Sequence, residues 1–285
     1  MKKIIIPISE KQIYNLENKI DGIILPLKDY SANYVKTFTL NEVTKIKEEF
    51  NKKIYIFINK NILNEEIDNL KTILNEVSKL DIDGVFFYDL AILNLYKKNN
   101  YNFKLIWSQE HFTTNSKTIS YYINEGVYSS YLSSEITKRE MIEILKEINK
   151  PLFINVFGYI PMFTSRRNLI NNYKKTFKIN DENEIYYIEK EGKKCPIYDN
   201  EHGSFVYSYN ILETIKECLE FDKINEFCAV FNGNLIEEDS FLKTINIFDN
   251  INKNNISQKE KELYELYDNL DKGFLYNETI YRVKK

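Results

Sequence analysis

The feature that most constrains the fold is a series of eight short apolar segments, seven of which precede residue 158 at intervals of about 20–30 residues. Nearly every residue within each segment is apolar, as is typical of strands buried on both faces of a parallel sheet. The segments are Lys3–Ile8, Gly22–Leu25, Lys53–Ile58, Gly84–Tyr88, Lys104–Trp107, Tyr128–Leu132, Leu152–Phe157 and Glu226–Phe231. We therefore expect eight parallel β-strands.

The segments between these strands have helical character. Ser9–Gln12, Thr39–Glu42 and Thr137–Glu140 each match a capping box, in which a hydroxyl and a later carboxylate or amide bind free backbone N–H groups. Eight alternating strands and helices predict an α/β fold, a (β/α)8 TIM-barrel-like domain of about 250 residues. A doubly wound open sheet is the alternative, but no GxGxxG motif follows any of the strands.

The alternation is interrupted between Asn171 and Ser208, where the pattern predicts a small antiparallel β insertion after strand seven. We expect one TIM-barrel-like domain over residues 1–255, with the insertion at about 171–208, and a C-terminal helix and tail over 256–285 that pack on the barrel. The strands expected in the insertion are Lys175–Asn180, Glu184–Lys190 and Phe205–Ser208.

Composition narrows the class of protein. The 285 residues carry a net charge of −3, and no apolar run approaches the ~18–20 residues that span a bilayer. Because Met1–Pro7 is also no signal peptide, we expect a cytoplasmic protein without membrane contact. A pI near 5.7 argues against a domain that binds nucleic acid by charge alone. Cys195, Cys218 and Cys228 are too few and too scattered for a disulfide framework or a zinc site, so we expect no metal.

Arginine is rare in this lysine-rich chain, with four residues in all, and two of them are adjacent. Arg166 and Arg167 follow Ser165 in the segment Val156–Asn168, directly after the seventh predicted strand. A guanidinium group offers a planar fork of donors that suits a carboxylate or a phosphate. We favour anion binding by this pair, the alternative being ion pairs that tie the insertion to the barrel.

In a barrel of this kind, the site lies at the carboxyl ends of the strands. Simpler roles are available to several polar residues there: Asp89 as a helix cap, Glu135 as an acidic residue near a helix N-terminus, and His202 as part of a turn. The motifs HExxH and GxSxG and the P-loop are absent. The candidate catalytic residues are Arg167, His202, Glu135 and Asp89, and the candidate substrate-binding residues are Arg166, Arg167, Ser165, Asn59, Gln109 and Glu110.

Several motifs, in a consistent order, resemble those of the peptidase U-32 family, also called collagenase-like proteases. They are Asp21–Ile24, Phe38–Leu40, Tyr55–Asn59, Tyr88–Ala91, Thr114–Asn115, Leu132–Ile136, Gly158–Asn168, Pro196–Gly203 and Gly273–Tyr276. The resemblance covers roughly residues 1–250, and the last two motifs resemble a short Firmicutes-type branch. Many members carry cysteines around Gly158–Asn168, and some hold an iron–sulfur cluster. Because Pro161 and Asn168 stand at the corresponding positions, we expect no such cluster and no other cofactor.

The resemblance implies competing activities. The short, cysteine-poor branch resembles proteins associated with 5-hydroxylation of the wobble uridine of tRNA, with prephenate as a co-substrate whose two carboxylates suit Arg166 and Arg167. We favour this role, and hence an enzyme. A peptidase acting on protein substrates and a non-catalytic subunit of a hetero-complex remain alternatives. Short members often accompany a longer paralogue, so we expect a hetero-complex in which that partner helps to bind tRNA.

Overall fold

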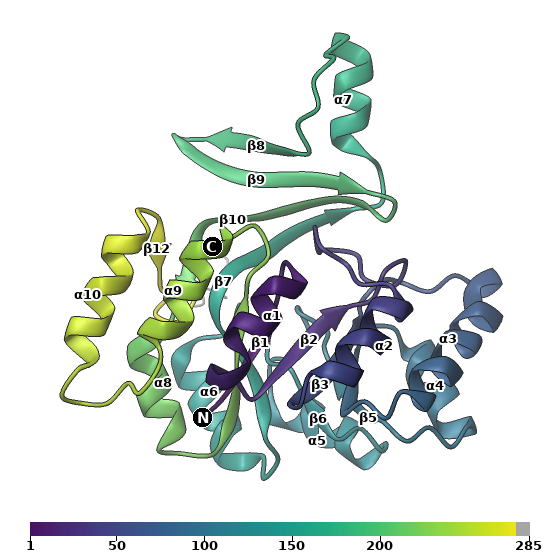
Figure 1. Ribbon diagram of the computed structural model, residues 1–285, viewed down its shortest axis with the longest axis horizontal. Coiled ribbons are helices and arrows are strands. Elements are labelled where there is room, and N and C mark those ends of the chain that lie inside the picture. The colour runs from purple at the N-terminus through teal and green to yellow at the C-terminus, as the bar shows by residue number, and fades with distance from the viewer. Residues whose placement is uncertain (278–285) are drawn as a thin grey trace, which may run out of the picture.

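The computed structural model describes residues 1–277, and eight parallel strands form a closed barrel within it (Figure 1). Hydrogen bonds link the strands in the order β6-β5-β4-β3-β2-β1-β11-β7. A parallel bridge between Tyr131 and Phe153 joins β6 to β7 and completes the circle. The predicted TIM-barrel-like fold is therefore confirmed. The strands are β1 (Lys2–Ile6), β2 (Gly22–Pro26), β3 (Lys53–Ile58), β4 (Gly84–Phe87), β5 (Lys104–Trp107), β6 (Ser129–Ser130), β7 (Leu152–Ser165) and β11 (Phe227–Asn232).

Helices cover the outside of the barrel. Thr39 and Thr137 form the predicted capping boxes with Glu42 and Glu140. At Ser9 only half of the box is present: the Ser9 hydroxyl accepts from the Gln12 N–H, but the Gln12 side chain accepts from the Ile8 N–H instead of the Ser9 N–H. Two single 3₁₀ turns, Glu17–Lys19 and Asn64–Glu66, adjoin α1 and α3. The barrel helices are α1 (Glu10–Leu16), α2 (Leu40–Glu49), α3 (Ile67–Lys79), α4 (Leu90–Lys98), α5 (Ser116–Asn124), α6 (Lys138–Glu147), α8 (Ile215–Asp222) and α9 (Glu238–Ile247).

Aromatic side chains fill the barrel interior. Phe57 and Phe86 stack with ring centroids 5.3 Å apart, and Phe153 meets Phe86 edge-on at 4.8 Å. Tyr55 packs edge-on against both Phe86 and Phe153. These offset and edge-on arrangements are favourable for aromatic rings. Because the interior is packed, polar chemistry is confined to the ends of the barrel.

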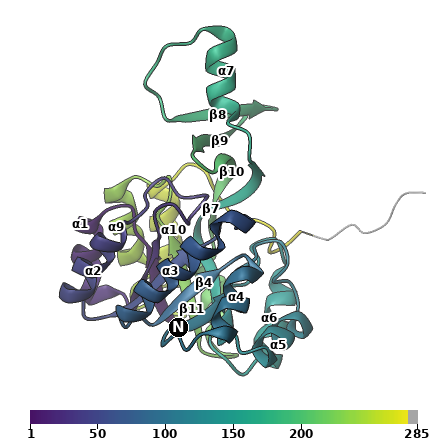
Figure 2. The ribbon, with the colours of Figure 1, turned by 90° about the vertical axis from the view of Figure 1, so that its right-hand side faces the viewer.

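Strand β7 leaves the barrel and continues into an antiparallel extension that projects from the mouth (Figure 2). The prediction that this strand ends at Phe157 is wrong, because the chain passes through Gly158 and runs on to Ser165. Gly158 has φ +127°, and a Cβ there would lie 2.4 Å from the Asn232 carbonyl oxygen. Only glycine fits both the conformation and the close approach. The extension comprises the outer half of β7 with β8 (Ile185–Lys190), β9 (Lys193–Asn200) and β10 (Gly203–Glu213).

The antiparallel insertion is thus confirmed, but two of its predicted elements differ. Lys175–Asn180 is not a strand, since residues Leu169–Phe177 form helix α7 and Lys178 ends it in the left-handed conformation. Strand β10 runs from Gly203 to Glu213 and is therefore longer than the predicted strand Phe205–Ser208, so that α8 starts only at Ile215. The pairing of β10 with β7 explains this, because it extends the strand back to the barrel rim.

The extension is fixed to the barrel at its base. The Tyr207 hydroxyl donates to the Asn33 carbonyl, and Asn234 Nδ2 donates to the same carbonyl at 3.3 Å. Asn200 Nδ2 donates to the Ala32 carbonyl at 2.7 Å. Since residues 32 and 33 belong to the loop after β2, these bonds hold strands β9 and β10 above the mouth.

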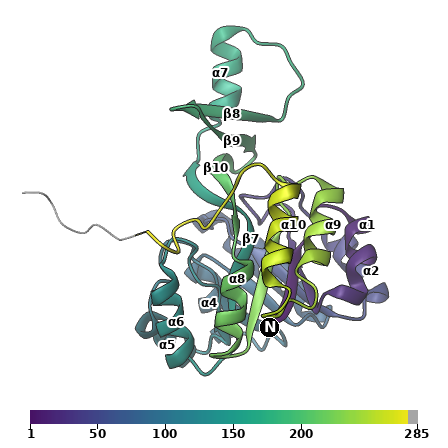
Figure 3. The same cartoon turned by 90° about the vertical axis from the view of Figure 1, so that its left-hand side faces the viewer.

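The C-terminal segment lies beside the barrel. Helix α10 (Ile256–Leu266) packs against α8 and α9 (Figure 3), and β12 (Leu270–Asp271) pairs with β10. The Lys138 N–H donates to the Leu275 carbonyl at 2.9 Å, which ties the following residues to α6. Within residues 1–277, no helix combines the length and the apolar character that crossing a bilayer requires.

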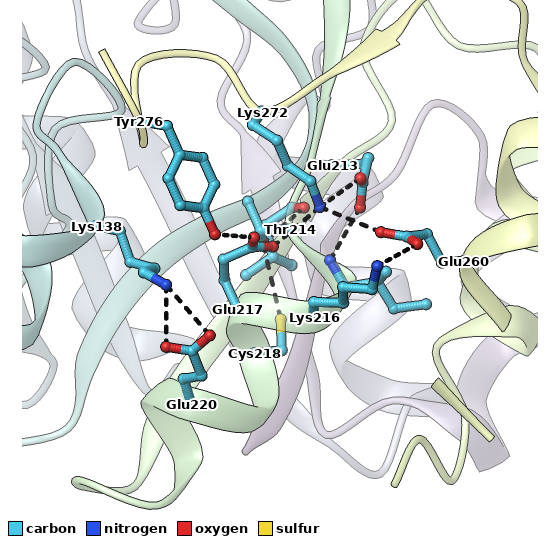
Figure 4. Close-up of polar contacts among 12 residues, drawn as sticks. Lys138, Glu213, Thr214, Lys216, Glu217, Cys218, Glu220, Glu260, Lys272 and Tyr276 are labelled. Carbon is cyan, nitrogen blue, oxygen red and sulfur yellow. Dashed lines mark hydrogen bonds and ion pairs between the residues drawn. The ribbon is translucent and has the colours of Figure 1, made fainter. Parts of the chain in front are cut away.

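An ionic cluster anchors this segment to α8 (Figure 4). Lys272 Nζ lies 2.5 Å from a Glu213 carboxylate oxygen and 3.1 Å from one of Glu217, and both glutamates are fully buried. Glu260 lies 3.7 Å away, and the Tyr276 hydroxyl donates to Glu217 at 2.6 Å. Burial lowers the pKa of Lys272, but the two buried carboxylates outweigh this and raise it above its usual range.

Candidate functional site

A polar cavity of about 560 Å³ lies at the barrel mouth, between the strand ends and the extension, and we call it the mouth cavity. A cavity of this size accommodates a small-molecule ligand. The loops after β2, β3, β4 and β5 contribute Asn33, Asn59, Lys60, Glu66, Tyr88, Glu110 and His111. The extension contributes Thr164, Arg166, Glu201, His202 and Phe205.

A chain of amide groups holds one carboxyl group at the floor of the mouth cavity. Asn59 Oδ1 accepts from the Ala32 N–H at 2.8 Å, and Asn59 Nδ2 donates to Asn33 Oδ1. Asn33 Nδ2 in turn donates to Glu110 Oε1 at 3.1 Å. The sequence-predicted residues Asn59 and Glu110 are therefore brought together, and Asn33 is the link between them.

Glu110 has an unusual electrostatic environment. Burial raises the pKa of its carboxyl group above the usual range, opposed by the hydrogen bond from Asn33 and by nearby His111. A carboxyl group with a raised pKa is suited to donate and accept protons near neutral pH. Glu110 is thus a candidate acid or base, beyond the binding role predicted from the sequence.

Glu135 lies at the edge of the same region. His111 Nδ1 is 3.3 Å from Glu135 Oε1, and both side chains are partly exposed. The Glu135 N–H donates to Ser133 Oγ at 3.1 Å, which shapes the loop after β6. The structure therefore places Glu135 beside Glu110 and His111, although it does not line the mouth cavity itself.

A small inner pocket of about 30 Å³ shares Glu110 and His111 with the mouth cavity. Ser108 and Asn155 line it, and Ser108 Oγ and Asn155 Oδ1 are buried without a hydrogen-bond partner among the described residues. Space of this size accepts a water molecule or one small polar group of a ligand. The inner pocket is therefore suited to a group that donates hydrogen bonds.

Two cations face the mouth cavity, and they differ in pairing. Lys60 Nζ lies 2.7 Å from Glu66 Oε1 and over the Tyr30 ring at 5.0 Å. Arg166 is exposed and forms no ion pair within residues 1–277. The adjacent Arg167 does not line the cavity; its N–H donates to Ser165 Oγ at 3.2 Å, and its carbonyl accepts from Ser204. The arginines therefore do not converge on one site, and Ser165 stabilises the turn that contains both.

His202 lines the mouth cavity from the extension, in the turn between β9 and β10. Its Nε2 is buried without a hydrogen-bond partner and lies 3.5 Å from Glu201 Oε1. Burial lowers the pKa of the imidazole, against the opposing effect of Glu201. His202 is therefore neutral at pH 7 and able to accept a proton.

Two predicted residues support loops beside the cavity. Asp89 is the N-cap of α4, where one oxygen accepts from the Ala91 N–H at 2.8 Å and the other from the Ile62 N–H at 2.9 Å. Gln109 Nε2 donates to the Tyr88 carbonyl at 3.1 Å. Neither residue lines the mouth cavity.

The three cysteines lie on three different elements, β9, α8 and β11. Burial raises the pKa of Cys218 to about 12 and that of Cys228 to about 11, so both are thiols at neutral pH. Over residues 1–277, no three His, Cys, Asp or Glu side chains group in a way that could hold a metal ion.

Several cavity residues were missed in the sequence. Asn33 lies in a long loop without periodicity, and Lys60 is one of many lysines, so neither carried a signal. Asn155 did carry one, because it is the only polar residue within the apolar segment Leu152–Phe157. A lone amide inside a buried strand needs a partner, and this requirement could have identified it.

Comparisons with known proteins agree with this architecture. The model of Peptidase family U32 matches residues 9–280. The chain is 25% identical over 276 residues to tRNA hydroxylation protein P2 of Bacillus subtilis (strain 168), an alignment that covers 88% of this chain and 89% of that protein. The solved structure of the U32 peptidase Mk0906 is similar in fold, with 12% identity, a TM-score of 0.52, and coverage of 81% of this chain and 92% of that chain.

Proposed function

Because this chain belongs to peptidase family U32, we propose that it takes part in tRNA hydroxylation, as the 5-hydroxylation of wobble uridine with prephenate as co-substrate. The observation that carries the proposal is the alignment with tRNA hydroxylation protein P2, which extends over nearly the whole length of both proteins. Because it covers 88% of this chain and 89% of that protein, the similarity is not confined to a single motif.

One cation of the mouth cavity supports a ligand that carries a carboxylate group. Arg166 presents a guanidinium group with no carboxylate partner within residues 1–277, whereas Lys60, which also lines the cavity, is already paired with Glu66. A forked guanidinium binds a carboxylate through two parallel hydrogen bonds. Arg166 is therefore the primary anchor in this proposal, and Arg167 is not needed for it.

Glu110 and His202 both line the mouth cavity, and their pKa values are shifted in opposite directions. The raised pKa of Glu110 favours its protonated form, and the lowered pKa of His202 favours its neutral form. Pairs of groups whose pKa values are displaced in this way serve as acid and base. In the proposal Glu110 donates a proton, His202 accepts one, and Glu135 orients His111 beside them.

The test is deletion of the gene, followed by mass spectrometry of nucleosides from purified tRNA. We expect 5-hydroxyuridine and its derivatives at the wobble position to fall, and a plasmid copy of the gene to restore them. An unchanged level in the deletion strain would remove the proposed function.

A peptidase is the second candidate, since the Thr164 hydroxyl and the His202 imidazole line the same cavity. A hydroxyl group and a neutral imidazole are the two groups that nucleophilic catalysis requires. Purified protein would then cleave casein or gelatin, and His202→Ala would abolish the cleavage. No cleavage by the wild-type protein excludes this candidate.

We also propose that a longer U32 paralogue forms a hetero-complex with this chain and shares the binding of tRNA. Co-purification of a tagged chain from its native cells tests the complex. If the deletion lowers tRNA hydroxylation but Arg166→Ala and His202→Ala both restore it fully, the chain is a non-catalytic subunit.

A further inference from the structure

We propose that helix α7 and its approach, residues 166–178, form an RNA-binding surface that brings the tRNA substrate to the mouth cavity; this inference rests on the proposed function. The segment contains five basic residues and no Asp or Glu. The whole chain has a net charge of −3, so the remaining residues carry −8. An acidic protein thus carries a basic segment at helix α7, which belongs to the extension that projects from the barrel (Figure 2).

Most of these basic groups are available to a ligand. Lys174 is the exception, because its Nζ lies 3.0 Å from an Asp181 oxygen and donates to the Asn183 carbonyl at 2.9 Å. Arg166, Arg167, Lys175 and Lys178 are exposed and form no ion pair within residues 1–277. Basic side chains without carboxylate partners bind phosphate groups without first breaking an internal pair.

Apolar side chains on the same helix add a second feature. Leu169, Tyr173 and Phe177 are spaced four residues apart and are 44%, 52% and 63% exposed. The rings of Tyr173 and Phe177 have centroids 4.7 Å apart. Helix α7 buries only Ile170, so this stripe has no partner within the described chain. Exposed aromatic rings beside basic side chains are typical of surfaces that stack unpaired bases.

The position of the segment connects it to the candidate site. Thr164 and Arg166 line the mouth cavity, and α7 begins three residues later, at Leu169. A nucleotide strand lying on α7 therefore has one end of its path at the cavity. The charge of the segment favours RNA over an uncharged protein partner for this surface, and it explains how an acidic chain contacts a polyanion.

The test compares two double variants. The first, Lys175→Gln/Lys178→Asn, removes two lysines from the proposed surface. The second, Lys71→Gln/Lys146→Asn, is the control and removes two exposed lysines without ion pairs in residues 1–277 from barrel helices α3 and α6. Asparagine suits position 178 because that residue is left-handed. Binding of an unmodified tRNA transcript to the full-length chain is measured by fluorescence anisotropy at several salt concentrations. We expect the first variant to bind roughly tenfold more weakly, with a salt slope reduced by about 1.4, and the second to bind as wild type.

Tyr173→Ala/Phe177→Ala tests stacking, and we expect a loss of roughly tenfold with an unchanged salt slope. Wild-type protein that fails to bind the transcript at low salt overturns the inference, as does equal weakening by both lysine pairs. If the α7 variants keep RNA binding but lose a co-purifying protein, the surface is a protein interface instead. Unchanged wobble 5-hydroxyuridine in the deletion strain would refute the proposed function, whereas the binding measurements decide the role of α7 separately.

Discussion

Replacement of Lys272 by methionine removes the cation that neutralises two buried carboxylates. Lys272 Nζ lies 2.5 Å from Glu213 and 3.1 Å from Glu217, and these side chains are 0% and 2% exposed. Methionine retains most of the apolar stem but not the charge. The substitution therefore tests the electrostatics of the cluster with little change in packing (Figure 4).

The expected cost follows from the partners that remain. Loss of one member of a buried ion pair costs about 3–5 kcal/mol. Glu213 keeps hydrogen bonds from the Tyr264 hydroxyl at 3.2 Å and the Ile215 N–H at 3.1 Å, and Glu217 keeps that from Tyr276. These bonds place the cost near the lower end, about 3 kcal/mol. For a chain of this length, that corresponds to about 5 °C in Tm.

The assay is urea unfolding followed by circular dichroism, at pH 5 and at pH 8. Without the cation, a buried carboxyl has a raised pKa in the folded state, so stability falls as pH rises through that value. The deficit of Lys272→Met is therefore larger at pH 8 than at pH 5. Lys216→Met is the control, since Lys216 also binds Glu260 at 2.5 Å but is half-exposed, and it costs under about 1 kcal/mol. Equal losses for both variants, or a deficit independent of pH, would show that Lys272 does not stabilise the protein by neutralising the two buried carboxylates.

Further substitutions test the site and the fold. Glu110→Gln keeps the hydrogen bond from Asn33 but removes a carboxyl group whose pKa is raised by burial. Because of that raised pKa, the wild-type protein loses stability as the pH rises above about 4.5. We therefore expect the variant to gain stability relative to the wild type at pH 7 but not at pH 4, which urea titrations at the two pH values measure. Gly158→Ala places a Cβ 2.4 Å from the Asn232 carbonyl oxygen, and we expect it to lower the free energy of unfolding by about 2 kcal/mol or more in a chemical denaturation experiment. Gly126→Ala is the control, because Gly126 also has a positive φ but has no atom within 4 Å of the added Cβ, and we expect a cost of about 1 kcal/mol. Equal costs would contradict the close approach at Gly158. Thr137→Ala removes a capping box and lowers the free energy of unfolding by about 1 kcal/mol, while Thr137→Ser retains most of it.

The barrel strands were predictable because strands that are buried on both faces appear in the sequence as short runs of almost exclusively apolar residues. Lys53–Ile58 and Lys104–Trp107 match the observed strands residue for residue. The outer half of β7 was not predictable in this way. Beyond Gly158 the strand is increasingly exposed, and its pairing with β10 depends on residues about 50 positions away. A local sequence pattern carries no information about pairing between such distant residues.

Helix α7 illustrates a different limit. Its residues are almost all exposed, so it has no buried face to impose a clear helical period. Its N-cap Asn168 makes no side-chain capping bond, and the segment Lys175–Asn180 therefore resembled an isolated strand. The feature that misled the prediction, an apolar stripe without a buried face, is the one that now suggests a binding surface.

The candidate site was predictable in part. The scarcity of arginine indicated Arg166, and the carboxyl ends of strands indicated Asn59 and Glu110, all of which line the mouth cavity. Arg167 does not, because successive residues leaving a strand point in different directions. Asn33 comes from a loop whose course is set by contacts with β10, which no local pattern describes.

In the proposed function, the mouth cavity serves tRNA hydroxylation through Arg166. The most direct measurement is the wobble 5-hydroxyuridine content of tRNA from the deletion strain, carrying either Arg166→Ala or Arg139→Ala. Arg139 is the matched control, an exposed arginine on α6 that pairs with Glu143 on the same helix. Loss of a charge-assisted contact to a carboxylate predicts a level about tenfold lower with Arg166→Ala, and full restoration with Arg139→Ala. Full restoration by Arg166→Ala would contradict the claim.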